Sequence, residues 1–184
     1  MHKFQNLDVR SVRGPLTRDY LISRGACVGE VYGDPALLLP YLFPEMIKDL
    51  KIKKRGILFV PNLHDFEMTA NSSAEVLNPT CHWRDCIKAI VQSEYVISSS
   101  LHGVVVAEAF GIPARLVDSG TEPPFKYEDY FKGTGRSQTH SAATFRSAEL
   151  EMQMVEPPQI NLEGLLASFP SDLWKPRSTK YTLN

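Results

Sequence analysis

Short apolar runs alternate with stretches of helical spacing through the middle of this chain of 184 residues. The runs at 56–61, 95–97 and 115–117 are the length of strands, and a continuously apolar strand is typical of a sheet covered on both faces. Apolar residues at helical spacing occupy 83–93 and 104–110, between these runs. Strands that alternate with helices in this way predict an α/β fold with a Rossmann-like, doubly wound parallel sheet.

The flanking segments carry weaker signals. Pro15 suits a first helical position, and Gly25 suits a carboxyl cap, so we expect a helix from Pro15 to about Arg24. A short helix is expected at 161–166 with Asn161 as its cap, and a brief strand at 76–77. Two prolines follow Asp118, and we expect a loop from there to about Arg136.

Composition narrows the class of protein. Hydrophobic residues make up 43% of the chain and the net charge is −1, which is typical of a globular protein and gives no reason to expect nucleic acid or an anionic membrane as a partner. Three cysteines without a framework spacing favour a reducing compartment, so we expect a cytoplasmic protein. The longest apolar runs fall short of the roughly 20 residues that a membrane helix needs.

The candidate residues for a functional site lie in turns where we expect strands to end. In parallel doubly wound sheets, ligands bind outside the carboxyl ends of the strands. Three residues fall at such positions: Arg13 before the first helix, His64 after the strand at 56–61, and His102 after the strand at 95–97. The segment Ser98–Gly103 resembles a turn into a helix amino end, where backbone N–H groups and a partial positive charge hold anions. We therefore expect an anion site there, with a histidine beside it.

Two other groups of residues have simpler explanations. Cys81, His82 and Cys86 lie close together in the sequence, but three candidate ligands without a second cluster do not predict a metal site. Glu108 is the only charge within the apolar stretch 104–110, and we expect it to be paired, with Arg115 as the candidate partner.

Three blocks of sequence together resemble the polysaccharide pyruvyl transferase family and occur in that family's order. They are residues 12–18, residues 32–40, and residues 97–103 followed by 109–113. The resemblance covers roughly residues 8–132. It implies the GT-B architecture of glycosyltransferases and the transfer of pyruvate from phosphoenolpyruvate to sugar hydroxyls of an exported or cell-surface polysaccharide, giving a cyclic ketal. The resemblance also implies a saccharide acceptor, with a lipid-linked form among the candidates, and a reaction that needs neither a metal nor another cofactor.

The family's amino-terminal Gly-Asn-x-Gly-Asp loop has no counterpart in the sequence. We therefore expect residues 1–45 to be the end of the family's amino-terminal half with the interdomain connection, residues 46–150 to be the Rossmann-like domain, and residues 151–184 to be a carboxyl-terminal helix and tail. Because GT-B sites lie between two domains, we also consider a homodimer in which a second copy supplies the other wall.

The resemblance assigns roles to individual residues. Arg13 matches the family's arginine block and is the expected anchor for the anionic donor, with Arg10 as the second candidate. His102 matches the histidine of the Leu-His-Gly block, and it is expected to act as general acid or base or to contact phosphate. The remaining substrate-binding candidates are Ser99, Ser100, Gly103 and His64. Two alternatives stay open: a GT-B glycosyltransferase domain that uses a nucleotide sugar, and a catalytically incomplete domain that binds a sugar or a partner.

Overall fold

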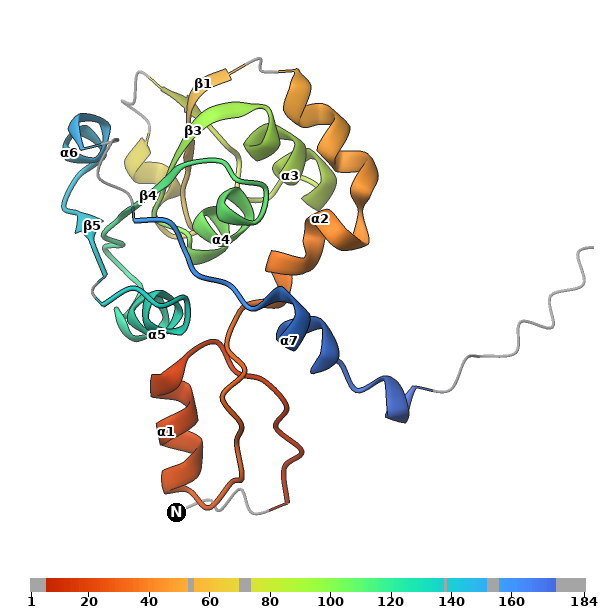
Figure 1. Cartoon of the computed structure of the whole chain (residues 1–184). Coiled ribbons are helices and arrows are strands. Elements are labelled where there is room, and N and C mark those ends of the chain that lie inside the picture. The colour runs from red at the N-terminus through yellow and green to blue at the C-terminus, as the bar shows by residue number, and fades with distance from the viewer. Residues whose placement is uncertain (1–5, 53–54, 70–73, 138, 152–155, 175–184) are drawn as a thin grey trace, which may run out of the picture.

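The computed structural model describes residues 6–52, 55–69, 74–137, 139–151 and 156–174. Within these ranges the chain forms a five-stranded sheet in the order β2-β1-β3-β4-β5, and every strand pair is parallel. The strands are β1 (Arg55–Val60), β2 (Glu75–Val76), β3 (Ser93–Ser98), β4 (Ala114–Val117) and β5 (Ser141–Ala142). The predicted Rossmann-like parallel sheet is confirmed (Figure 1).

Helices connect the strands and extend the chain at both ends. The α-helices are α1 (Pro15–Ser23), α2 (Leu39–Leu42), α3 (Trp83–Val91), α4 (Leu101–Ala109), α5 (Phe125–Gly133), α6 (Phe145–Leu150) and α7 (Leu162–Ala167). The 3-10 helices are η1 (Pro35–Leu38), η2 (Pro44–Lys51), η3 (Phe66–Thr69) and η4 (Ser171–Leu173). The expected helices at 15–24, 83–93 and 161–166 are all present, and Asn161 caps α7 as predicted.

Side chains from the two faces of the sheet enter two separate clusters. Leu58 and Val96 are fully buried in the larger cluster, to which α3 and α4 contribute. The neighbouring Phe59 and Ile97 point to the other face and pack with Ala148 of α6. Because adjacent strand residues alternate between faces, the continuous apolar runs are explained by burial on both sides.

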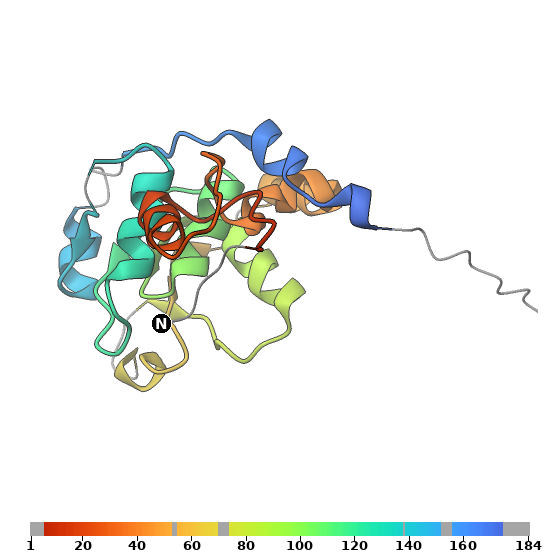
Figure 2. The same ribbon diagram turned by 90° about the horizontal axis from the view of Figure 1, so that it is seen from below.

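Residues 6–34, here called the N-terminal lobe, extend from one end of the sheet, with α1 next to α5 (Figures 1 and 2). Two parallel bridges, Val9–Val28 and Val12–Tyr32, hold the lobe together. Asp129 of α5 is fully buried and accepts hydrogen bonds from the backbone N–H of Thr17, at 3.0 Å, and from its hydroxyl. A carboxylate from α5 thus caps the first turn of α1.

The predicted loop from Asp118 to about Arg136 is wrong, because α5 occupies its second half. Tyr127, Tyr130 and Phe131 are buried on one side of this helix, at the spacing of adjacent helical turns. The two prolines precede the helix, and Pro124 is its N-cap residue. Proline disrupts a helix interior but is compatible with a helix start, so this proline pair precedes a helix rather than indicating a continuous loop.

Glu108 is paired as expected, but not with Arg115. Its carboxylate accepts two hydrogen bonds from Arg136, at 2.6 and 3.2 Å, and one from the hydroxyl of Tyr130 at 2.6 Å. Arg115 instead pairs with Glu151. Arg136 follows α5, so the unpredicted helix is what brings this guanidinium to Glu108.

No helix within the described ranges has the length and apolar character that a membrane crossing requires. The domain boundaries after residues 45 and 150 remain predictions, and residues 175–184 of the expected tail lie outside the described part of the chain.

Candidate functional site

The strand order reverses between β1 and β3, the central pair of the sheet. On one side of β1 the chain runs outward to β2, and on the other side it continues through β3 and β4 to β5. At such a switch point the connections leave in opposite directions and open a crevice at the carboxyl ends of the strands. The loops after β1 and β3 are therefore the expected floor of a site.

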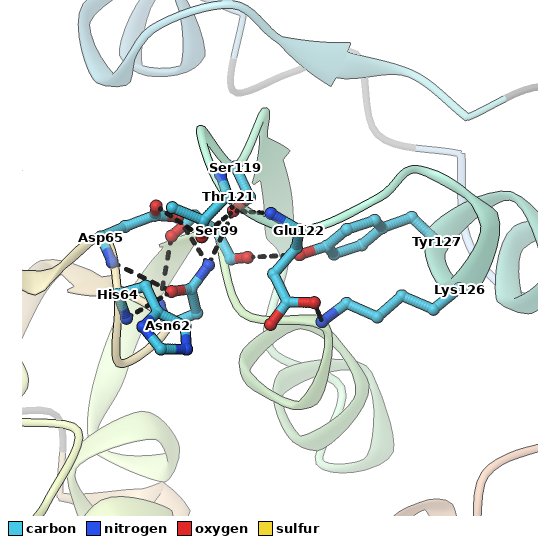
Figure 3. A network of polar contacts seen from close by, with 9 residues as sticks. All are labelled: Asn62, His64, Asp65, Ser99, Ser119, Thr121, Glu122, Lys126 and Tyr127. Carbon is cyan, nitrogen blue, oxygen red and sulfur yellow. Dashed lines mark hydrogen bonds and ion pairs between the residues drawn. The ribbon is translucent and has the colours of Figure 1, made fainter.

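Hydrogen bonds hold the loops after β1, β3 and β4 together (Figure 3). Asn62, after β1, donates its backbone N–H to the Ser99 hydroxyl at 3.2 Å. Its side-chain amide donates to Asp65 at 2.6 Å and to the Ser119 hydroxyl, after β4, at 2.8 Å. Ser119 also accepts the backbone N–H of Glu122 at 3.1 Å. Asn62 thus fixes the loops after β1, β3 and β4 relative to one another.

A pocket of about 330 Å³ lies beside this network. Its polar lining includes Asn62, Ser100, His102, Glu122 and Lys126, and its apolar wall comes from α3, α4 and the segment after β2. Glu122 and Lys126 form an ion pair of 2.8 Å at the start of α5 (Figure 3). The pocket is large enough for a small anionic metabolite.

His102 lies in the first turn of α4 and contacts Asp34, the residue before η1. The distance between His102 Nε2 and Asp34 Oδ2 is 3.4 Å, and the histidine side chain keeps 71% of its surface exposed. The hydrogen bond to Asp34 raises the pKa of His102, against the opposing effects of burial and nearby cations. Burial opposes ionisation of Asp34, yet hydrogen bonds from His102 and the Ala36 backbone hold its pKa below the usual value.

Two further cations lie near this histidine. The charges of Arg13, from the N-terminal lobe, and of Lys126, from α5, both oppose protonation of His102. Arg13 also favours ionisation of Asp34. Its Nε atom is buried and has no hydrogen-bond partner among the described residues. Arg13, His102 and Lys126 therefore form a cationic group, contributed by three separate segments of the chain.

Two of the other predicted site residues, Arg10 and Ser99, are engaged elsewhere in the structure. Arg10 forms ion pairs with Asp8 and with Asp172 of η4, which engage its guanidinium in holding the N-terminal lobe to the carboxyl-terminal segment. Ser99 is 2% exposed, and its carbonyl accepts the Tyr127 hydroxyl at 2.8 Å. Burial, followed by the charges of Glu122 and Asp65, raises the pKa of Tyr127 to about 12, so the phenol stays a donor.

His64 and Asp65 are neighbours with different surroundings. His64 is exposed, and its backbone N–H donates to the Asn62 side chain at 2.8 Å (Figure 3). Asp65 is buried and its carboxylate accepts from Asn62. The two side chains share no hydrogen bond within the described network, so the structure supports loop positioning by Asp65 rather than an acid–base pair.

Ser100 and Gly103 both line the pocket, but packing alone explains why position 103 is a glycine. A Cβ atom added to Gly103 would lie 2.2 Å from Ser98 Oγ and 2.9 Å from Val60 Cγ1. The α4 backbone therefore packs directly on the ends of β1 and β3. Ser100 is the N-cap residue of α4 without a side-chain capping bond, so its hydroxyl is not committed to the helix end.

Comparison with known proteins agrees with the three sequence blocks. The family model described as polysaccharide pyruvyl transferase matches residues 2–121. The chain belongs to the polysaccharide pyruvyl transferase family. It is also similar to the succinoglycan biosynthesis protein ExoV of Rhizobium meliloti (strain 1021), with 32% identity over 135 residues. That alignment covers 70% of this chain and 41% of the relative, so the chain spans less than half of it. No solved structure matches the chain.

The family match contains Arg13, Asp34, Asn62 and His102, and it ends just before Glu122 and Lys126. Sequence reasoning missed Asn62, Asp34 and Lys126 as site residues. Asp34 lies in a Gly-Asp-Pro sequence, which is typical of a turn and does not by itself indicate a site. Lys126 lies in the segment expected to be a loop. Their positions just after β1, just before η1 and within α5 become informative only when the elements are placed in space.

A second pocket of about 310 Å³ adjoins the first and shares Glu122 with it. Carboxylates and hydroxyls dominate its polar lining: Asp118, Ser119, Glu122, Thr139 and Ser141. It lies at the carboxyl end of β4, and Thr139 and Ser141 line it from the start of β5.

The Cys81, His82 and Cys86 group does not form a metal cluster, and no set of three potential ligands of a metal occurs within the described ranges. The Nδ1 atom of His82 instead accepts the backbone N–H of Arg84 at 3.3 Å and caps α3.

Proposed function

We propose that this chain carries the donor site of a pyruvyl transferase that moves pyruvate from phosphoenolpyruvate to a saccharide and forms a ketal. The pocket at the β1–β3 switch point carries this proposal, because His102 and Lys126 line it and the charge of Arg13 acts on His102. Family membership supports the transfer of a pyruvyl group. The name of the ExoV relative supports a polysaccharide as the acceptor.

Phosphoenolpyruvate has a phosphate and a carboxylate on adjacent atoms, and both need cationic partners. When the ketal forms, two C–O bonds to sugar oxygens replace the enol double bond and the C–O bond to phosphate. The methylene carbon gains one proton, and the released phosphate takes the second of the two hydroxyl protons. A site for this reaction must hold two anionic groups and supply an acid and a base near neutral pH.

The three cations suit these needs in different ways. A guanidinium can bind a phosphate or a carboxylate through two parallel hydrogen bonds, and the buried Nε of Arg13 lacks a partner among the described residues. His102 is exposed to the pocket and can exchange a proton. Lys126 is a point charge already paired with Glu122, so a bound phosphate competes with that carboxylate.

We place the saccharide acceptor in the second pocket, beyond Glu122. Its carboxylates and hydroxyls suit the hydroxyl groups of a neutral sugar and repel a dianionic phosphate. The shared Glu122 puts the two ligands next to each other. The GT-B architecture, the cytoplasmic location and a homodimer remain predictions that belong to the same proposal.

The test is calorimetric titration of the chain with phosphoenolpyruvate. We expect Arg13→Ala and His102→Ala to weaken binding about tenfold or more, since each removes a charge-assisted hydrogen bond. Arg10→Ala is the matched control, because this arginine is engaged by Asp8 and Asp172. It should bind the donor as the wild type does.

Each contrary result removes a specific part of the proposal. Equal weakening by Arg10→Ala would contradict the assignment of Arg13 as anchor. Binding of a nucleotide sugar in place of phosphoenolpyruvate would favour the glycosyltransferase alternative. A folded protein that binds neither would refute a donor site in this chain and support a catalytically incomplete domain. Light scattering on the same sample tests the dimer, which a monodisperse monomer would exclude.

A further inference from the structure

Asp34 occupies a rigid position at the junction of the N-terminal lobe and the sheet. Gly33 precedes it with φ of 145°, a conformation that favours glycine, and Pro35 follows it. One oxygen of the Asp34 carboxylate accepts the backbone N–H of Ala36 at 3.0 Å, which caps η1. The Asp34 residue is only 8% exposed. Its carboxylate is therefore held in one orientation by the backbone around it.

The second carboxylate oxygen faces His102. Asp34 Oδ2 lies 3.4 Å from Nε2 of the imidazole, and His102, whose side chain is 71% exposed, lines the pocket. A histidine whose one nitrogen is bound by a fixed carboxylate has a defined tautomer and ring orientation. The other nitrogen, Nδ1, is then the one available for chemistry.

We propose that Asp34 is a positioning residue that holds the His102 imidazole through Nε2, so that Nδ1 is the atom that meets the anionic donor. The identity of the donor rests on the proposed function, whereas the Asp34–His102 arrangement does not. Nδ1 donates its proton while the ring is an imidazolium, and it accepts a proton when the ring is neutral. One atom thus serves as acid and base at different stages.

The groups that face His102 determine its charge. Asp34 stabilises the imidazolium, and Arg13 from the N-terminal lobe and Lys126 from α5 oppose it. Glu122, paired with Lys126, and Cys86 of α3 line the same pocket. The pKa of His102 is raised, so the imidazolium persists to higher pH than for a free histidine and is lost as pH rises through that value. Without the Asp34 charge, the two cations would lower this pKa.

The test is an NMR titration of the histidine side chains in the full chain without ligand. The His102 signals are assigned by their loss in His102→Gln. In Asp34→Asn we expect the His102 pKa to fall below that of the wild type. Asp172→Asn, which removes a carboxylate paired with Arg10, is the control and should leave His102 unchanged. Because Asp34 also caps η1, Asp34→Ser is a second variant that keeps a capping oxygen without the charge.

The pH dependence of phosphoenolpyruvate affinity gives the second measurement. Affinity should decline as pH rises through the His102 pKa, and in Asp34→Asn this decline should move to lower pH, with affinities within about twofold at the acidic end. An unchanged His102 pKa in both folded Asp34 variants would overturn the inference. A lowered pKa in a protein that binds no donor would support positioning by Asp34 and overturn the donor assignment alone.

Discussion

The buried ion pair between Glu108 and Arg136 allows a quantitative test of the packing around α4 and α5. The side chains of Arg136 and Glu108 are 2% and 3% exposed. Glu108→Ala removes the acceptor of two hydrogen bonds from Arg136 and of one from Tyr130. It leaves a guanidinium buried between Thr134 and the ring of Phe131, whose centroid lies 3.9 Å from the guanidinium carbon. Breaking such a pair costs about 3–5 kcal/mol of the free energy of unfolding.

Urea denaturation followed by circular dichroism measures this cost. With an m-value of about 2 kcal/mol per molar urea, a loss of about 4 kcal/mol lowers the midpoint by about 2 M. The matched control is Glu149→Ala, which removes the partner of the exposed Arg146 and should cost less than about 1 kcal/mol. The double variant Glu108→Leu/Arg136→Met should recover most of the loss, because it leaves no buried charge behind.

A Glu108→Ala variant no less stable than Glu149→Ala would refute this reasoning. It would mean that Arg136 finds another partner or reaches solvent at little cost. A double variant as unstable as Glu108→Ala would locate the cost in lost packing rather than in the unpaired guanidinium.

Two further predictions test the candidate site and the cysteines. Gly103→Ala should cost about 1–3 kcal/mol in the same denaturation assay, because the new methyl group meets Ser98 and Val60, whereas Gly29→Ala, with open space around its Cβ position, should leave the midpoint nearly unchanged. Equal midpoints for the two variants would contradict the close packing of α4 on β1 and β3. Burial, with a smaller effect of Cys81, raises the pKa of Cys86 to about 11, so at pH 8 a thiol reagent should modify the exposed Cys27 well before Cys86, as read by mass spectrometry of peptides. Faster modification of Cys86 would show that its pocket opens in solution.

The parts of the fold that rest on local signals could be predicted from the sequence. The apolar runs at β1, β3 and β4 and the helical spacing of α3 and α4 follow from burial on both sides of a sheet, and they were confirmed. The helix α5 could not be predicted in the same way, because Pro123 and Pro124 are compatible both with a loop and with the start of a helix.

The site could be predicted only in part, because its composition depends on long-range contacts. His102 could be found from its own turn, and Arg13 from its family block. Asp34 contacts His102, and the charge of Lys126 acts on it, only after η1 and α5 have packed near α4. No sequence pattern near Asp34 or Lys126 indicates this arrangement. Glu108 is a single charge in an apolar stretch, and this was enough to predict that it has a partner. The sequence did not indicate that the partner is Arg136, because the unpredicted helix α5 brings Arg136 to Glu108.

The capping of α1 by Asp129 also determines the order in which parts of this protein can fold. Thr17 and Asp129 are 112 positions apart, and the N-cap residue of α1, Gly14, provides no side-chain cap. During synthesis, α1 leaves the ribosome long before Asp129 exists, and a nine-residue helix is marginal in water by itself. The N-terminal lobe, and with it Arg13, therefore reaches its final place only after the chain has been made through α5. The placement of Arg13 thus depends on a contact with α5, a helix that is synthesised after it.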